Sequence, residues 1–197
     1  MSEDYEAEAP MILIPYGGGE AGYYNYYYVF KDKAPDVFFW YDAEEGAVVD
    51  ESYTIPAGTA IWVWQNSGRN CTVTFAGEVI SDSSVPVYTY SDAWTFFANP
   101  YPIPLSIASE KISYEGIEAV SMSEDYEAEA PSILIPYGDG EAGYYNYYYV
   151  FKDKAPDVFF WYDAEEGAIV DEDTGILPVS SGAWFWSMND VTIRFTK

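Results

Sequence analysis

The chain contains no histidine and a single cysteine, Cys71, among its 197 residues. Without histidine there is no imidazole to act as a general base, to ligate a metal ion or to complete a serine–histidine triad. One cysteine cannot form an intrachain disulfide or a thiolate zinc site, and its place in an apolar segment favours packing over reactivity. These absences exclude the commonest catalytic and metal-binding chemistries.

Basic residues are scarce: 8 Lys and Arg stand against 33 Asp and Glu, which gives a formal net charge of −25. So little positive charge cannot neutralise phosphates, and we expect no nucleic-acid partner and no docking on an anionic membrane. No apolar run approaches the ~18 residues of a membrane-spanning helix, so membrane insertion is not expected. Residues 1–4 lack the basic and apolar regions of a signal peptide.

An internal repeat accounts for the unusual composition. Residues 2–51 reappear at 123–172, and only three of these 50 positions differ. The two copies hold 25 of the 33 acidic residues and 16 of the 21 Tyr, so charge and tyrosine content are properties of one duplicated unit. The three differing pairs are Met11/Ser132, Gly18/Asp139 and Val48/Ile169.

We expect two repeat units, residues 1–81 and residues 82–197, the second with extra N-terminal strands. Weaker similarity extends the repeat beyond residue 51, to about 75 residues in both copies. A unit of that length buries only a modest core. Because 82–122 has no counterpart before residue 2, the first unit is expected to need a donated strand, from the same chain or from a neighbouring molecule.

Apolar residues alternate with a period of two and are rich in β-branched and aromatic types, which predicts short strands between Gly, Pro and Asn turns. We therefore expect an all-β fold, an antiparallel sandwich or barrel built from the internal duplication. The one weak helical candidate is Leu105–Ile112. The predicted strands before the second copy are Ile12–Tyr16, Tyr23–Phe30, Val37–Tyr41, Ala60–Trp64, Cys71–Phe75, Val85–Tyr90, Trp94–Ala98 and Ile117–Met122.

The first candidate surface is a run of tyrosines that occurs in both copies. In a strand, this run places aromatic rings on both faces of the sheet. Tyrosine offers a large contact area at low entropic cost, which suits protein interfaces and stacking on sugars; the alternative is a strand buried on both faces. The residues are Tyr23, Tyr24, Tyr26, Tyr27 and Tyr28 in the first copy and Tyr144, Tyr145, Tyr147, Tyr148 and Tyr149 in the second.

The second candidate surface is a Trp-x-Trp pair, Trp62 and Trp64 in the first copy and Trp184 and Trp186 in the second. Residues two apart in a strand share a face, so each pair forms a double-indole platform. Such a platform can stack on sugar rings, although tryptophans lie more often in the core.

Acidic turns are the candidate metal sites. Calcium prefers 6–8 oxygen ligands, and clustered carboxylates on a turn can supply several of them. None of the turns matches the spacing of an EF-hand loop, so the competing interpretation is a solvated acidic loop. The candidate calcium ligands are Asp42, Glu44, Glu45, Asp163, Glu165, Glu166, Asp139 and Glu141.

No motif singles out a catalytic residue, and we expect no enzyme. The sequence contains no nucleophile elbow, phosphate-binding loop or dinucleotide fingerprint. A carboxylate pair could hydrolyse glycosides without histidine, but 33 acidic residues supply such pairs by chance. A third explanation of the acidity is a halophilic surface, which would unfold at low salt.

One segment resembles a known group of proteins. Residues 93–102, Ala-Trp-Thr-Phe-Phe-Ala-Asn-Pro-Tyr-Pro, are similar to the W-x-x-x-(A/G)-N-P-Y-P segment of secreted bacterial cell-surface β-proteins. Trp161-Tyr162-Asp163 and Gly182–Trp186 resemble elements that follow it in that family. The resemblance implies an extracellular or cell-surface, non-catalytic module, and it transfers no site.

Taken together, these features favour a structural or assembly protein that self-associates through its tyrosine-rich repeats. Two near-identical copies give two similar contact surfaces, and head-to-tail contacts of that kind generate filaments or arrays when their rotation does not close. The alternative is a carbohydrate-binding or adhesive module, assisted by calcium, with a glycan as its partner.

Overall fold

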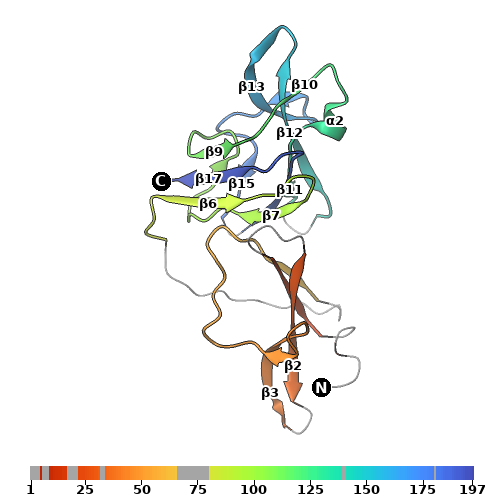
Figure 1. Cartoon of the computed structure of the whole chain (residues 1–197), viewed down its shortest axis with the longest axis vertical. Coiled ribbons are helices and arrows are strands. Elements are labelled where there is room, and N and C mark those ends of the chain that lie inside the picture. The colour runs from red at the N-terminus through yellow and green to blue at the C-terminus, as the bar shows by residue number, and fades with distance from the viewer. Residues whose placement is uncertain are drawn as a thin grey trace. The chain divides into compact units, whose positions relative to one another are not determined.

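The computed structural model describes residues 5, 9–16, 22–31, 34–65, 80–138, 141–179 and 181–197. The chain divides into two compact units (Figure 1): unit 1 comprises Met1–Pro56 with Ile61–Glu78, and unit 2 comprises Ala57–Ala60 with Val79–Lys197. The predicted all-β class is confirmed, and within the described ranges no sheet closes into a barrel. No helix in this part of the chain is long and apolar enough to cross a membrane.

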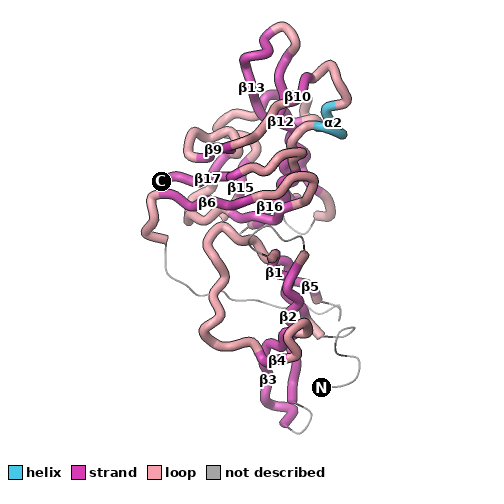
Figure 2. The backbone as a smooth tube through the Cα atoms, in the orientation of Figure 1, coloured by secondary structure: helices cyan, strands magenta, loops and turns pink. Residues whose placement is uncertain are grey.

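Unit 1 contains one antiparallel sheet of five strands, in the order β4-β3-β2-β1-β5 (Figure 2). Alternation along β1 directs Ile12 and Ile14 to one face, where they form a small buried cluster with Tyr26. Trp40 packs against this cluster and is only partly buried. The strands are β1 (Met11–Pro15), β2 (Tyr23–Lys31), β3 (Ala34–Asp42), β4 (Ala47–Val48) and β5 (Trp62–Trp64).

Unit 2 contains a large sheet in the order β14-β13-β12-β11-β16-β7, with β10 pairing in parallel with β12. A second sheet has the order β6-β17-β9, and β15 pairs with β8. The strands are β6 (Ser84–Tyr88), β7 (Thr95–Ala98), β8 (Leu105–Ser106), β9 (Ile112–Glu115), β10 (Val120–Ser121), β11 (Ser132–Pro136), β12 (Tyr144–Lys152), β13 (Ala155–Asp163), β14 (Ala168–Ile169), β15 (Ile176–Leu177), β16 (Gly182–Trp186) and β17 (Thr192–Thr196).

The two larger sheets of unit 2 pack face to face as a sandwich. Phe97, Ile133 and Phe185 of the large sheet join Ile193 and Phe195 of β17 in one core cluster, and all five are completely buried. The Phe97 and Phe195 ring centroids lie 6.2 Å apart, which is contact distance for aromatic rings. Face-to-face packing of two sheets around such a core is the β-sandwich arrangement.

The edge strand β7 of unit 2 is bordered by Ala57–Ala60, which belong to the same unit. Thr59 forms a β-bridge with Phe97, and the backbone N–H of Ala98 donates to the carbonyl of Gly58 at 2.8 Å. These bonds occupy part of an edge that would otherwise be open to pairing with another chain.

The repeated residues fold in the same way in both units. Ile12 lies opposite Tyr26 as Ile133 lies opposite Tyr147, and the register of each long hairpin shifts after the same phenylalanine. The Trp-x-Trp strands also correspond, because Trp62 pairs with Leu13 as Trp184 pairs with Leu134. Sequence identity therefore fixes the hairpin and its register in both settings.

The helix predicted over Leu105–Ile112 is wrong, because this segment forms β8, a turn and the first residue of β9. The Ser106 hydroxyl oxygen accepts a hydrogen bond from the backbone N–H of Ala108 at 3.1 Å, and such local side-chain bonds compete with helix formation. The short helix α2 (Tyr126–Glu129) was not predicted, since four residues carry no helical periodicity. The predicted strand Cys71–Phe75 lies outside the described residues, and Ile117–Met122 shortens to β10.

Candidate functional site

The hairpins β2–β3 and β12–β13 carry most of the aromatic side chains of each repeat. In unit 2, Tyr149 pairs with Trp161 and Phe151 pairs with Phe159 across the two antiparallel strands. On this face, the Tyr149 ring lies 5.2 Å from Trp161 and 6.2 Å from Phe159. Cross-strand aromatic pairs of this kind stabilise a sheet and stiffen its hairpin.

The opposite face of each hairpin is aromatic too. Tyr126 of α2 packs edge-on against Tyr148 and Tyr162, with ring centroids 5.4 and 6.0 Å away. Tyr5 makes the matching contacts in unit 1, at 5.4 Å from Tyr27 and 5.7 Å from Tyr41. The prediction of aromatic rings on both faces of the tyrosine run is confirmed.

The predicted tyrosines divide by burial. Tyr26, Tyr27 and Tyr147 are buried, whereas Tyr28 and Tyr145 are 40% and 42% exposed. The run is therefore neither a buried strand nor a fully open platform. The half-buried members are Tyr23, Tyr24, Tyr144, Tyr148 and Tyr149.

Burial keeps the central phenols neutral. It raises the pKa of Tyr147 to about 12, with a further contribution from the Asp163 carboxylate. It also raises the pKa values of Tyr26 and Tyr114. These phenols therefore stay neutral to a higher pH than an exposed tyrosine does.

Only unit 2 covers its hairpin with further strands among the described residues. Tyr114 of β9 packs edge-on against Trp161 at 5.1 Å and stacks against Phe185 at 6.4 Å. Trp161 is 3% exposed as a result, whereas the identical Trp40 of unit 1 is only half-buried. Trp161 is thus a core residue of unit 2, whereas Trp40 is not fully buried in unit 1.

An open hollow of about 340 Å³ lies between the hairpin and this cover. No charged side chain lines it, although the protein carries a net charge of −25. The Tyr114 hydroxyl donates to the carbonyl of Ile107 at 2.9 Å. The lining consists of Ile107, Ala108, Ile112, Tyr114, Tyr149, Phe159, Phe160, Trp161 and Val170.

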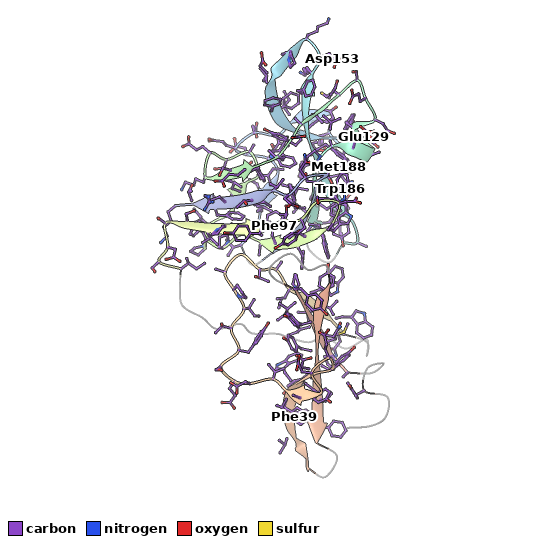
Figure 3. All side chains as sticks on the ribbon, in the orientation of Figure 1. Phe39, Phe97, Glu129, Asp153, Trp186 and Met188 are labelled. Atoms are coloured by element: carbon purple, nitrogen blue, oxygen red, sulfur yellow. The ribbon has the colours of Figure 1, made fainter. Side chains whose placement is uncertain are left out.

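The hairpin tips expose large apolar side chains in both units. Val37 and Phe38 are 51% and 52% exposed, and their copies Val158 and Phe159 are 57% and 52% exposed. Asp153, labelled in Figure 3, marks the tip of the unit 2 hairpin, where its carboxylate accepts hydrogen bonds from Ser121 and Ser123. Exposed apolar groups at a rigid, repeated position are typical of contact surfaces.

The acidic turns are organised by their own backbone. Asp42 Oδ1 accepts hydrogen bonds from the N–H groups of Glu44 and Glu45 at 2.9 and 3.1 Å. The Tyr16 hydroxyl donates to the Glu44 carboxylate at 3.1 Å. Asp163 accepts the same two turn bonds, from Glu165 and Glu166 at 2.9 and 3.0 Å.

In the described ranges, no three acidic or cysteine side chains are grouped so that they could hold a metal ion. Glu141 is exposed, and Asp139 lies outside those ranges. Calcium binding at these turns stays a prediction, and the Asx turn explains why an aspartate begins each of them.

None of the four Trp-x-Trp residues belongs to the fully buried core. Trp184 and Trp186 are half-buried, and Trp184 stacks on Phe96 of β7 with ring centroids 4.4 Å apart. Trp62 and Trp64 are 39% and 38% exposed. In each copy, the residue between the two tryptophans faces the other side of the sheet. This residue is Val63 in unit 1, where it is exposed, and Phe185 in unit 2, where it is completely buried.

Sequence reasoning missed the hairpin tips and the hollow. The alternation predicts ordinary strand residues at these tips, and nothing in it signals that Val37, Phe38, Val158 and Phe159 lie exposed at the strand ends. The hollow combines the repeat with Ile107, Ile112 and Tyr114, which lie outside it in sequence. Comparison with family models, curated proteins and solved structures found no match to this chain.

Proposed function

We propose that this chain is a non-catalytic structural protein of the cell exterior, whose tyrosine-rich acidic β repeats pack into filaments or a surface array. The proposal rests chiefly on the two hairpin tips, which expose Val37 and Phe38 in one unit and Val158 and Phe159 in the other. The same exposed apolar hairpin tip occurs twice in one chain, so each molecule can contact more than one neighbour. The extracellular setting is proposed from the sequence resemblance alone.

A protein of such high net charge needs uncharged contacts in order to self-associate. At −25, acidic surfaces of two copies repel each other at low ionic strength. The exposed apolar side chains of the hairpins and of β5 are among the uncharged groups available for contact. Burial of such rings contributes most of the energy in many protein interfaces.

Strand donation is a second part of the proposal. Val63 of β5 is 38% exposed, whereas its counterpart Phe185 is completely buried beside β7 and beneath β9. In unit 2, pairing with β7 therefore accompanies the complete burial of this position of the repeat. A neighbouring molecule could supply that strand to unit 1 by β-augmentation.

Sedimentation velocity of the purified chain over a wide concentration range, with and without calcium, tests the proposed function. We expect a rising mean mass with concentration, and elongated or planar assemblies in negative-stain images. Monodisperse monomers under all these conditions would contradict the proposal.

Calcium-assisted carbohydrate binding is the second candidate function. It is favoured by the Tyr16 and Tyr24 rings, whose centroids lie 4.6 Å apart beside the Glu44 carboxylate that accepts the Tyr16 hydroxyl. An aromatic ring next to a carboxylate combines the stacking and hydrogen-bonding groups that a sugar requires. A glycan array in calcium-containing buffer tests it, and a blank array would count against it.

A further inference from the structure

A segment of four residues, Ala57–Ala60, belongs to unit 2 although the chain on both sides of it belongs to unit 1. We call this segment the strap. Gly58 and Ala60 are buried, and Ala60 is only 4% exposed. A short segment that leaves one unit to complete the sheet edge of another has the connectivity of a donated strand.

The strap pairs with the edge strand β7 through backbone groups. Thr59 forms an antiparallel bridge with Phe97, and the backbone N–H of Ala98 donates to the carbonyl of Gly58 at 2.8 Å. Backbone hydrogen bonds do not depend on which molecule supplies the strand. The strap of a second copy can therefore form the same bonds at the same edge.

Two glycines fit the strap and its acceptor edge to each other. Gly58 has a φ of 80°, and an added Cβ there would lie 2.8 Å from Cγ2 of Val87 in β6. At Gly182 of β16, an added Cβ would lie 2.8 Å from the Cβ of Ala60. The contact therefore selects this segment by its shape, and the occupant that fits the edge is another copy of the strap.

We propose that the strap of one copy pairs with the β7 edge of a second copy and so links the two molecules. This inference rests on the proposed self-association and names its donor and its acceptor. The closed and the exchanged forms contain the same bonds, so exchange costs little beyond the entropy of bringing two molecules together.

The length of the chain permits the exchange. Fifteen residues, 65–79, separate the end of β5 from Ile80 of unit 2. A chain of that length spans at most about 50 Å, so it does not force a strap to close on its own unit 2. Closure within one copy is unimolecular and prevails in dilute solution, and exchange gains on it as the protein concentration rises.

The direction of exchange determines the assembly that forms. Two copies that exchange their straps reciprocally make a closed dimer. A copy that donates its strap to one neighbour and receives a strap from another extends an open filament, because donor and acceptor are different surfaces.

Two single variants separate the donor from the acceptor. Gly58→Ala disables the strap through backbone strain and the collision with Val87, and it leaves β7 intact. Ala98→Pro removes the N–H that bonds to the Gly58 carbonyl. This N–H points to the strap, and proline is tolerated at such a position of an edge strand.

Mixing the variants tests the exchange. In an equimolar mixture, the intact strap of the Ala98→Pro copy meets the vacated β7 edge of the Gly58→Ala copy, and neither copy can close on itself. We expect a 1:1 heterodimer in sedimentation velocity, with an affinity at least tenfold tighter than parental self-association. Each variant alone is expected to associate no more strongly than the parent.

Gly167→Ala is the matched control. Gly167 also has a positive φ, of 67°, but an added Cβ there would lie 3.6 Å from the Tyr162 hydroxyl oxygen and touch no part of the strap. Its own strap still covers its β7 edge, so a mixture with Ala98→Pro should associate no more strongly than the parent does. Near-UV circular dichroism checks that each variant is folded.

The outcomes distinguish this inference from the proposed function. If the parent associates and the two folded variants sediment in the mixture as they do separately, the exchange is wrong while self-association stands. If Gly58→Ala alone associates as strongly as the mixture, the open edge pairs with itself and the strap is not the donor. A parent that stays monomeric at all concentrations overturns both.

Discussion

Units 1 and 2 place nearly the same fifty residues in two different settings. The hairpins, their registers and their edge-on tyrosine contacts are the same in both. The burial of their shared face is not: Trp161 is buried under Tyr114, and Trp40 is only half-buried. Within the part of the chain that the structure describes, the comparison teaches that the repeat forms one layer of a sandwich, and that residues outside it complete the core of unit 2.

The largest expected effect comes from deleting the same tryptophan in each unit. Trp161→Ala removes a fully packed indole and should lower the free energy of unfolding of unit 2 by about 3–5 kcal/mol. Trp40→Ala should cost unit 1 roughly half as much, because part of its side chain is already hydrated. Denaturant unfolding of both variants measures the difference, and equal losses would contradict the contrast between the units.

Substitution of the glycine that precedes each hairpin should instead destabilise the two units equally. Gly22 and Gly143 have φ of 135° and 136°, and an added Cβ would collide with the ring of Tyr16 or Tyr137. Replacement of either glycine by alanine should cost roughly 1–3 kcal/mol through strain. Thermal unfolding of the two variants should give matching losses, and a unit that tolerates its alanine would break the equivalence of the hairpins.

Alkaline pH should weaken both units through their central tyrosines. The pKa of Tyr147 is raised to about 12, first by burial, so unfolded chains release this proton at lower pH than folded ones do. Its contribution to stability is complete below about pH 10 and is lost as the pH rises through about 12. Tyr147→Phe should flatten this decline in a series of unfolding curves, and Tyr26→Phe should do the same for unit 1 because the Tyr26 pKa is also raised by burial. An unchanged slope would show that other groups dominate.

The smallest effects concern two exposed aspartates with different donors. A hydrogen bond from Ser52 lowers the pKa of Asp50, and one from Thr174 lowers the pKa of its counterpart Asp171. Each carboxylate adds stability above its unfolded pKa, and that stability is lost as the pH falls through the lowered folded value. Ser52→Ala should raise the pKa of Asp50 toward its ordinary value, and Thr174→Ala should do the same for Asp171, as measured by carboxyl NMR titration. A shift in only one of the two variants would show that the two units hold this aspartate differently.

Much of the fold follows from the sequence because strands alternate and the repeat is explicit. Ile12 and Ile14 are buried as the period of two requires, and Tyr23–Phe30 nearly coincides with β2. The segment Leu105–Ile112 was misread because Leu105, Ile107 and Ile112 are buried by three different local structures. The hollow could not be predicted from the sequence. Its two walls come from separate segments of the chain, and their contact depends on how strands without sequence similarity pack against each other.

The identity of β2 and β12 has a consequence for folding. Strand β1 can pair with β12, or β11 with β2, in the same registers, and Met11 in place of Ser132 is the one residue that distinguishes β1 from β11. Refolding from denaturant therefore offers crossed hairpins as a competing product, the characteristic failure of repeat proteins. Synthesis from the N-terminus avoids the confusion, because β1 and β2 can meet before β11 and β12 have been made.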